Sequence, residues 1–266
     1  MKVPLAFPLR LHRPKQPHQT MGGRSRLGMP RLRQCFSVHK AGNALHECED
    51  AYAWWAGERG WVVAIADGAT ESSFARQWAQ ILVETYVRRP TQDLSSDWLY
   101  PLQQHWAQWL DAQQLRWYAR RKAQEGTFAT LLGLVLLRDR QWRAIAVGDS
   151  CLFVVRQQRV MACFPITNGQ LLGFRPPLLS SQGQQPPLIV PARSLCGVGR
   201  LGDRFYLVTD ALAAWIFSQL ELGNNPWQQL NQIRNSRQFC QWVDGERSLQ
   251  RLPNDDTTLI CLELRS

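Results

Sequence analysis

The sequence predicts an α+β fold built in layers, with β-sheets packed face to face and helices outside them. Short runs of apolar and β-branched residues, separated by turn residues, recur along the chain after Gly126. Two stretches with helical spacing of apolar residues lie between an earlier apolar run and these later ones. A sheet has an apolar face and a helix has an apolar stripe, and each must pack against another element. Stacked layers of sheets and helices bury both kinds of apolar surface.

The N-terminal 34 residues are predicted to be a basic tail outside the folded domain, which we assign to residues 35–266. The tail contains five prolines among arginines and has no apolar periodicity, a composition typical of disorder. An Arg-rich segment without acids is typical of a targeting or docking arm. The alternative is a mis-called start codon, with Met21 or Met29 as the true start.

The first predicted strand covers residues 61–66, an apolar run that ends at Asp67 and Gly68. Side chains that cap helices follow it, and apolar residues then recur at intervals of three and four over residues 75–87. Pro90 ends this first helix. A buried strand that leads into an amphipathic helix is therefore predicted for this part of the chain.

A second helix is predicted to begin near Asp97 and to carry one broad apolar stripe as far as Trp117 and Tyr118. The stripe is rich in tryptophan, a large side chain that contributes most when it is buried. We expect these rings to pack in the core against a sheet, and stacking on a ligand is the alternative.

After Gly126 the spacing of the apolar residues becomes that of strands. A compact turn at residues 138–140 joins the first two runs, which predicts a hairpin. Residues 156–203 are rich in Pro, Gln and Ser and are predicted to form irregular loops with short strands, whereas residues 211–250 are predicted to be helical. The predicted strands are 127–137, 142–147, 151–155, 204–209 and 257–264.

The net charge of +10 is concentrated in the tail. Nine of the 31 Lys and Arg precede Glu47, the first acid, and subtracting them leaves 22 against 21 Asp and Glu. We therefore expect no nucleic-acid partner, and a salt-dependent nucleic-acid role of the tail is the alternative. No apolar run is long enough to span a bilayer, so we expect no membrane partner.

The seven cysteines are scattered along the chain and form no C-x-x-C pair. Their odd number and spacing argue against a disulfide framework and against a zinc site. Free thiols persist in a reducing compartment, so we expect a cytoplasmic protein.

Acidic residues stand at the ends of the predicted strands. Asp67, Asp149 and Asp210 each close a strand, Asp255 opens the last one, and Glu49-Asp50 opens a further one. Matching strand ends meet at one sheet edge, where several carboxylates repel each other unless cations neutralise them. Mg²⁺ and Mn²⁺ prefer oxygen ligands, and two such ions can activate a water for attack on phosphorus. A single Asp-Gly is more often a plain turn, so the prediction depends on the ordered set.

In these segments the chain resembles the metal-dependent protein serine/threonine phosphatases of the protein phosphatase 2C type, as a bacterial-like member. The resemblance covers about Lys40 to Ser266, and two helices lie between its second and third segments, as in the family. It implies a β-sandwich of two antiparallel sheets flanked by helices on both faces. The matching segments are 49–52, 64–68, 126–130, 147–150, 207–212 and 255–259.

The resemblance implies two or three Mn²⁺ or Mg²⁺ ions. Asp67 would bridge the two catalytic metals, and the backbone carbonyl of Gly68 would contact one of them. Asp210 and Asp255 would hold the other metal. With Asp67 they form the implied catalytic set.

Three further acids complete the implied metal site. Glu49, with Asp50 beside it, would support the first metal directly or through water. Asp149 would be the outer ligand of a weaker third metal that it shares with Asp210.

Two positions depart from the family's pattern. Eukaryotic members often have a His after the Asp-Gly pair, a candidate general acid, and here that position is Ala69. Some members hold the substrate phosphate with an Arg four positions before the Glu-Asp pair, and here that position is Leu45. The neighbouring His46 is the candidate substitute for the Arg, and a surface His without a role is the alternative.

The resemblance therefore implies an enzyme that hydrolyses phosphoserine and phosphothreonine in proteins by in-line attack of a metal-bridging hydroxide. The alternative is a catalytically weak pseudophosphatase that binds phosphoproteins or a kinase, and the two departures are its motivation. The expected partners are a phosphoprotein substrate and a partner Ser/Thr kinase. We expect the chain to be a monomer.

Overall fold

The computed structural model describes residues 30–70, 72, 74–172, 176–183 and 192–265. Its helices are α1 (Ala75–Arg88), α2 (Ser96–Asp111), α3 (Trp117–Gln124), α4 (Asp210–Glu221), α5 (Pro226–Leu230) and α6 (Ser236–Ser248), with short 3₁₀ turns η1 (Leu45–Glu47) and η2 (Gly169–Leu171). Its strands are β1 (Pro30–Val38), β2 (Ala51–Gly57), β3 (Gly60–Ala66), β4 (Phe128–Ala129), β5 (Leu131–Leu137), β6 (Gln141–Val147), β7 (Cys151–Arg156), β8 (Arg159–Phe164), β9 (Leu179–Ser180), β10 (Arg193–Val198), β11 (Arg204–Val208) and β12 (Thr257–Leu264).

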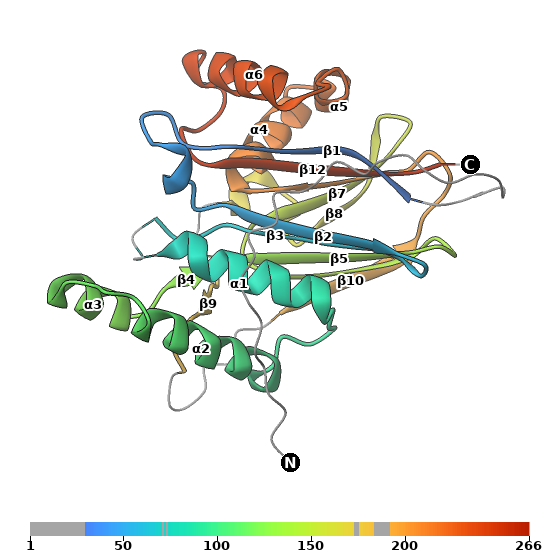
Figure 1. The fold of residues 1–266 in the computed structure, drawn as a ribbon. Helices are drawn as coiled ribbons and strands as arrows, with labels where there is room; N and C mark the ends of the chain where they lie inside the picture. Colours follow the sequence, from blue (N-terminus) through green and yellow to red (C-terminus); the bar gives the residue numbers. More distant parts are fainter. Residues whose placement is uncertain (1–29, 71, 73, 173–175, 184–191, 266) are drawn as a thin grey trace.

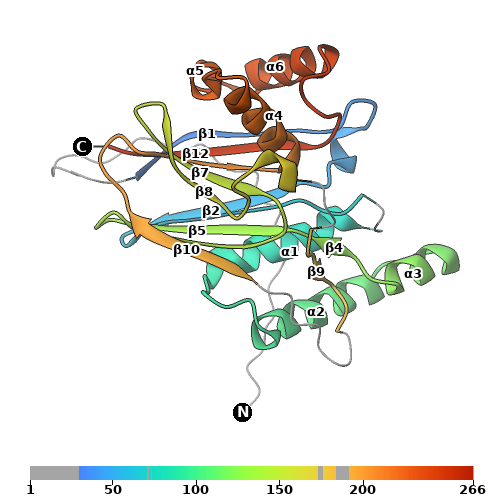
Figure 2. The same cartoon turned by 180° about the vertical axis from the view of Figure 1, so that it is seen from behind.

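Ten of these strands form two five-stranded sheets that pack face to face. One sheet has the order β1-β12-β11-β7-β8 and the other has the order β10-β6-β5-β3-β2. Every pairing within them is antiparallel. Figures 1 and 2 show α4, α5 and α6 over the outer face of the first sheet and α1 and α2 over the outer face of the second. The predicted sandwich of two antiparallel sheets with helices on both faces is confirmed.

The apolar core is divided into three layers because both faces of each sheet are covered. Val63 and Leu132 belong to the layer between the two sheets. Trp78 and Tyr86 of α1 pack with Leu131 on the outer face of the second sheet. Alternate residues of one strand therefore lie in different layers. Because both faces of β5 are buried, its sequence is an almost continuous apolar run.

Several predicted elements are confirmed in position and in pairing. The first helix ends at Arg88, just before Pro90. The turn at residues 138–140 joins β5 and β6 as a hairpin, with Leu131 opposite Val147. Arg140 adopts a φ of 71°, a conformation common in tight turns.

Other elements differ from the prediction. Residues 30–34, which we predicted to be part of the tail, begin β1 and pair with β12, while residues 1–29 lie outside the described chain. The second helix ends at Asp111, and Trp117 begins α3 with its side chain 77% exposed rather than in the core. Apolar spacing continued across the break, so the pattern alone did not show it.

Residues 156–203 contain more regular strand than predicted, and the predicted helical region 211–250 is divided into separate helices. Residues 156–203 include β8 and β10, and β10 pairs with β6 over its whole length. Residues 173–175 and 184–191 of the same region lie outside the described chain. The predicted helical region 211–250 consists of α4, α5 and α6. Among the described helices, none combines the length and apolarity needed to cross a membrane.

Candidate metal centre

The acids that we predicted at strand ends lie at one end of the sandwich. Residue pairing brings the start of β2 to the end of β3, and the end of β11 to the start of β7. These are the strand ends that adjoin Asp50 and Asp67 in the first case, and Asp210 and Asp149 in the second. The loops concerned share one side of the molecule in Figure 1.

Asp67 is at the centre of this group. Four other carboxylates, those of Asp50, Asp210, Asp149 and Asp255, act electrostatically on it. Burial first, and then these negative charges, raise the pKa of the Asp67 carboxyl well above its ordinary value. Five of the six predicted acidic ligands therefore lie close enough to one another to interact electrostatically.

The main chain of Asp67 is fixed to the neighbouring strands. Its N–H donates to the Thr130 hydroxyl at 2.9 Å, and its carbonyl accepts from the Thr130 N–H at 2.8 Å. The Thr130 hydroxyl also lies 3.1 Å from the Ser150 hydroxyl, next to Asp149. Thr130 thus ties the loop of Asp67 to the loop of Asp149, and it interrupts the predicted strand 127–137 between β4 and β5.

Gly68 is required by the packing of α1. A Cβ at this position would approach the Cβ of Ala75 to 2.8 Å, closer than two carbon atoms pack. Gly68 also forms an isolated antiparallel bridge with Ala129. The absence of a side chain therefore lets the Asp67 loop lie directly between α1 and β4.

The side chain of Asp50 is buried, and only one of its two carboxylate oxygens accepts hydrogen bonds from described residues. Its Oδ2 accepts from the hydroxyl of Thr258 at 2.6 Å and from the hydroxyl of Thr209 at 3.0 Å. Its Oδ1 has no hydrogen-bond partner among the described residues. A buried carboxylate oxygen without a partner is costly, and a cation satisfies it.

Asp210 and Glu49 also lie in an environment that disfavours their negative charge. Burial, followed by the charges of Asp149 and Asp255, raises the pKa of Asp210 to about 6. Burial is also the main cause that raises the pKa of Glu49, against the hydroxyl of Thr70, which lowers it. Both shifts have the direction expected for carboxylates crowded together without their cations.

The residues present fit a hard divalent cation. The group contains oxygen donors, most of them carboxylates, which is the ligand type that Mg²⁺ and Mn²⁺ prefer. Within the described residues, no three His, Cys, Asp or Glu side chains converge closely enough to enclose an ion by themselves. Mutual repulsion keeps bare carboxylates apart, and ions of this kind usually retain several waters among their ligands.

Two residues that support this centre were missed in the sequence. Asp256 is buried, and its carboxylate accepts from the N–H of Lys40 at 2.7 Å and from the N–H of Glu49 at 2.5 Å. Arg247 of α6 donates to the carbonyl of Asp255 at 2.5 Å and to the carbonyl of His39 at 3.0 Å. The position of Asp256 directly after Asp255 was a sequence signal for its role. No residue near Arg247 in the sequence indicated the role of Arg247.

Asp256→Ala is expected to lower the free energy of unfolding by about 2 kcal/mol, because the N–H groups of Lys40 and Glu49 lose their acceptor. Chemical denaturation of the metal-free protein measures the change. Asp256→Asn is the matched control, since its amide oxygen still accepts one of the two bonds, and it should be less destabilised. Equal stability of Asp256→Ala and the unsubstituted protein would contradict this role.

The phosphate contact at His46 stays a prediction. His46 is an exposed residue of η1, and its side chain makes no hydrogen bond to any described residue. Leu45 is 71% exposed. The cation that reaches this turn is Arg76 of α1, whose Nη1 donates to the carbonyl of Leu45 at 3.1 Å and to that of Cys48 at 2.9 Å.

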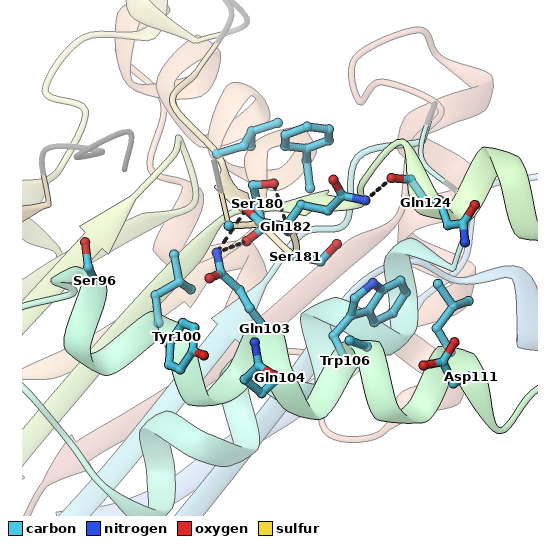
Figure 3. A pocket seen from close by; sticks show the side chains of 16 residues that line it. Ser96, Tyr100, Gln103, Gln104, Trp106, Asp111, Gln124, Ser180, Ser181 and Gln182 are labelled. Carbon is cyan, nitrogen blue, oxygen red and sulfur yellow. Dashed lines mark hydrogen bonds between the residues drawn. The ribbon is translucent and has the colours of Figure 1, made fainter. Parts of the chain in front are cut away.

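A pocket of about 580 Å³ lies elsewhere, between α2 and the segment around β9 (Figure 3). Tyr100 and Trp106 line it from α2, and Gln103 donates to the carbonyls of Ser180 and Gln182, both at 3.1 Å. None of the predicted metal ligands lines this pocket. It is therefore separate from the carboxylate group.

A sequence model described as protein phosphatase 2C matches residues 43–244, which is more than half of the chain. The matched range contains Glu49, Asp50, Asp67, Asp149 and Asp210. The chain belongs to the protein phosphatase 2C family. Asp255 follows the matched range and keeps the order expected from the resemblance. No curated protein matches this family member significantly by sequence.

Solved structures show the same protein phosphatase 2C fold at low sequence identity. The chain is 17% identical to RsbX in complex with magnesium, with 89% of this chain and 100% of that chain covered and a TM-score of 0.51. It is 16% identical to the catalytic domain of the serine/threonine phosphatase PstP in complex with two manganese ions (90% and 100% covered, TM-score 0.58). The S. agalactiae serine/threonine phosphatase is 14% identical (89% and 100% covered, TM-score 0.57).

Proposed function

We propose that this member of the protein phosphatase 2C family is a metal-dependent phosphatase of phosphoserine and phosphothreonine in proteins. The observation that carries the proposal is the set of carboxylates that surrounds Asp67 at one end of the sandwich. The metal ions named for RsbX and PstP support the choice of Mg²⁺ or Mn²⁺. Two or three ions per chain are proposed.

Asp67 would serve both catalytic ions. Asp210 and Asp255 would hold one of them, and the Gly68 carbonyl, with Glu49, would support the other. Bound ions of this kind polarise a phosphate and lower the pKa of the water that attacks phosphorus. The chain's own contribution is positioning: Thr130 fixes the Asp67 loop.

Further groups around the centre orient the outer acids. Asp50 lies buried against two threonine hydroxyls, which fix its carboxylate close to Asp67. Asp149 would hold the weaker third ion. Ala69 has no proton to give at the position where some relatives have a His, so the leaving serine or threonine oxygen would take its proton from water.

The proposal predicts metal-dependent release of phosphate. We expect the full chain to hydrolyse a chromogenic phosphate ester and a phosphothreonine peptide with Mn²⁺, and to lose this activity when a chelator removes the metal. Steady-state rates with Mn²⁺, with Mg²⁺ and with the chelator measure it. Equal rates with and without the chelator would contradict metal dependence, and no hydrolysis under any condition would contradict the enzyme assignment.

A pseudophosphatase is the second candidate, and Leu45 and Ala69 are the observations that favour it. Such a protein would bind a phosphoprotein or a kinase without turnover. Binding of a phosphothreonine peptide with no detectable Mn²⁺ binding at millimolar metal would support it. Hydrolysis of the same peptide would exclude it.

The cellular setting is proposed from the chemistry of the chain. All seven cysteines are free, which suits the reducing cytoplasm. We infer a monomer that removes phosphate from a signalling phosphoprotein, with a Ser/Thr kinase as its second partner.

A further inference from the structure

Lys40 is a cation at the rim of the candidate metal centre. It follows β1, and its Nζ lies 4.0 Å from Oδ1 of Asp255. Its charge also acts on Glu49, where it favours the ionised carboxylate. The Lys40 ammonium therefore lies close to two predicted ligands that the family resemblance assigns to different metals.

The main chain of Lys40 is held firmly while its side chain remains accessible. The Lys40 N–H donates to Oδ1 of Asp256 at 2.7 Å, and Oδ2 of the same carboxylate holds the N–H of Glu49. One buried carboxylate thus fixes Lys40 and Glu49 relative to each other. The Lys40 side chain is 35% exposed, so its ammonium can meet a molecule that approaches from solvent.

We propose that Lys40 binds the phosphate group of the substrate, in the place of the arginine that this chain lacks at position 45. The proposal rests on the proposed phosphatase function and adds the residue that recognises the substrate's charge. A phosphate that sits at the two metal positions would lie beside both Asp255 and Glu49, and hence beside Lys40. An ammonium offers three donors to phosphate oxygens.

The other cationic groups near this rim are less suited to the role. Arg76 donates its Nη1 hydrogens to the carbonyls of Leu45 and Cys48 and so stabilises the turn η1. His46 makes no side-chain hydrogen bond to a described residue and is exposed. Arg247 directs its guanidinium at the carbonyls of His39 and Asp255. Of these groups, Lys40 is the one that approaches the side-chain carboxylate of a predicted ligand.

A residue that only maintains the structure of the site is the competing role, and the two roles predict different results for Mg²⁺ binding. A phosphate-binding Lys40 opposes metal binding and favours phosphate binding, because it repels the cations and attracts the anion. In Lys40→Met, phosphate should therefore bind about tenfold more weakly while Mg²⁺ binds as tightly as before or more tightly. A residue that only maintains the site would weaken both when it is removed.

The experiment titrates Mg²⁺ into the metal-free full chain, and then inorganic phosphate into the Mg²⁺-loaded chain, by isothermal calorimetry. Lys40→Arg should retain phosphate affinity within about threefold, because it keeps the charge and the donors. Arg88→Met is the matched control, since it removes a surface cation that pairs with Glu84 on α1. In steady-state hydrolysis, Lys40→Met should raise KM about tenfold with a smaller change in kcat.

Each outcome decides the proposal. Weaker phosphate binding with unweakened Mg²⁺ binding in Lys40→Met, restored in Lys40→Arg, supports it. An unchanged phosphate affinity in Lys40→Met, joint loss of Mg²⁺ and phosphate, or no phosphate binding by the unsubstituted chain overturns it. A chain that binds phosphate through Lys40 but hydrolyses no ester would overturn the proposed function and leave Lys40 as the phosphate contact.

Discussion

Asp67→Asn is expected to reduce Mn²⁺-dependent phosphate release by about 10³-fold or more, because catalytic groups that act as a unit fail together. Four other carboxylates of the acidic group act electrostatically on the carboxylate of Asp67. An amide of the same shape cannot supply the charge that two bridged cations need. The hydrogen bonds of Asp67 to Thr130 use the main chain and are therefore retained.

The measurement compares initial rates on a phosphothreonine peptide for the unsubstituted chain and for Asp67→Asn. Asp139→Asn is the matched control, because Asp139 is an exposed acid in the β5–β6 turn whose bonds are to Gln141. Far-ultraviolet circular dichroism should show the same fold for all three proteins. A rate for Asp67→Asn within tenfold of the unsubstituted rate would contradict the assignment.

The metal-free protein is expected to become less stable as the pH rises through about 6. The pKa of Asp210 is raised from 3.8 to about 6 in the folded state, chiefly by burial. A raised folded-state pKa gives stability that is complete below the unfolded value and is lost above the folded value. The shift of Asp210 alone corresponds to a loss of about 3 kcal/mol between pH 4 and pH 8. The pKa values of Asp67 and Asp50 are raised as well, so their charges add to the loss.

Thermal unfolding in the presence of a chelator, at steps of pH from 4 to 8, measures this loss. Mn²⁺ should remove most of it, because bound cations neutralise the same carboxylates. Asp210→Asn isolates the contribution of one residue. Without metal, its melting temperature at pH 8 should be higher than that of the unsubstituted chain. Mn²⁺ should raise its melting temperature by less than it raises that of the unsubstituted chain. A lower melting temperature of metal-free Asp210→Asn at pH 8 would contradict this explanation.

The sequence allowed the sandwich and the acidic group to be predicted because both depend on local patterns. Residues 61–66 are apolar and end at Asp67, so strand and carboxylate are visible together. The hairpin at residues 138–140 was likewise a property of adjacent residues. Antiparallel pairing then brings the strand ends to one side of the molecule, as Figure 1 shows.

The residues that were missed act over long separations in the chain. Asp256 holds the N–H groups of Lys40 and Glu49, more than 200 positions away. Arg247 supports the Asp255 loop from α6. A buried polar contact of this kind depends on the final packing, which no periodic pattern of apolar residues encodes.

The misplaced boundaries have a similar cause. Pro30 to Gln34 begin β1 because β12 offers them a partner strand, although their own composition continues that of the tail. β10 is paired in the same way with β6, inside a region rich in proline. Tertiary pairing therefore decided these strands, and local propensity did not.

The central claim is that the acids around Asp67 bind divalent metal, and calorimetric titration of the metal-free chain with Mn²⁺ tests it most directly. We expect at least two Mn²⁺ ions per chain, with the number or the affinity reduced in Asp67→Asn and in Asp255→Asn and unchanged in Asp139→Asn. No heat of binding at millimolar Mn²⁺, or the same titration curve for Asp67→Asn as for the unsubstituted chain, would contradict it.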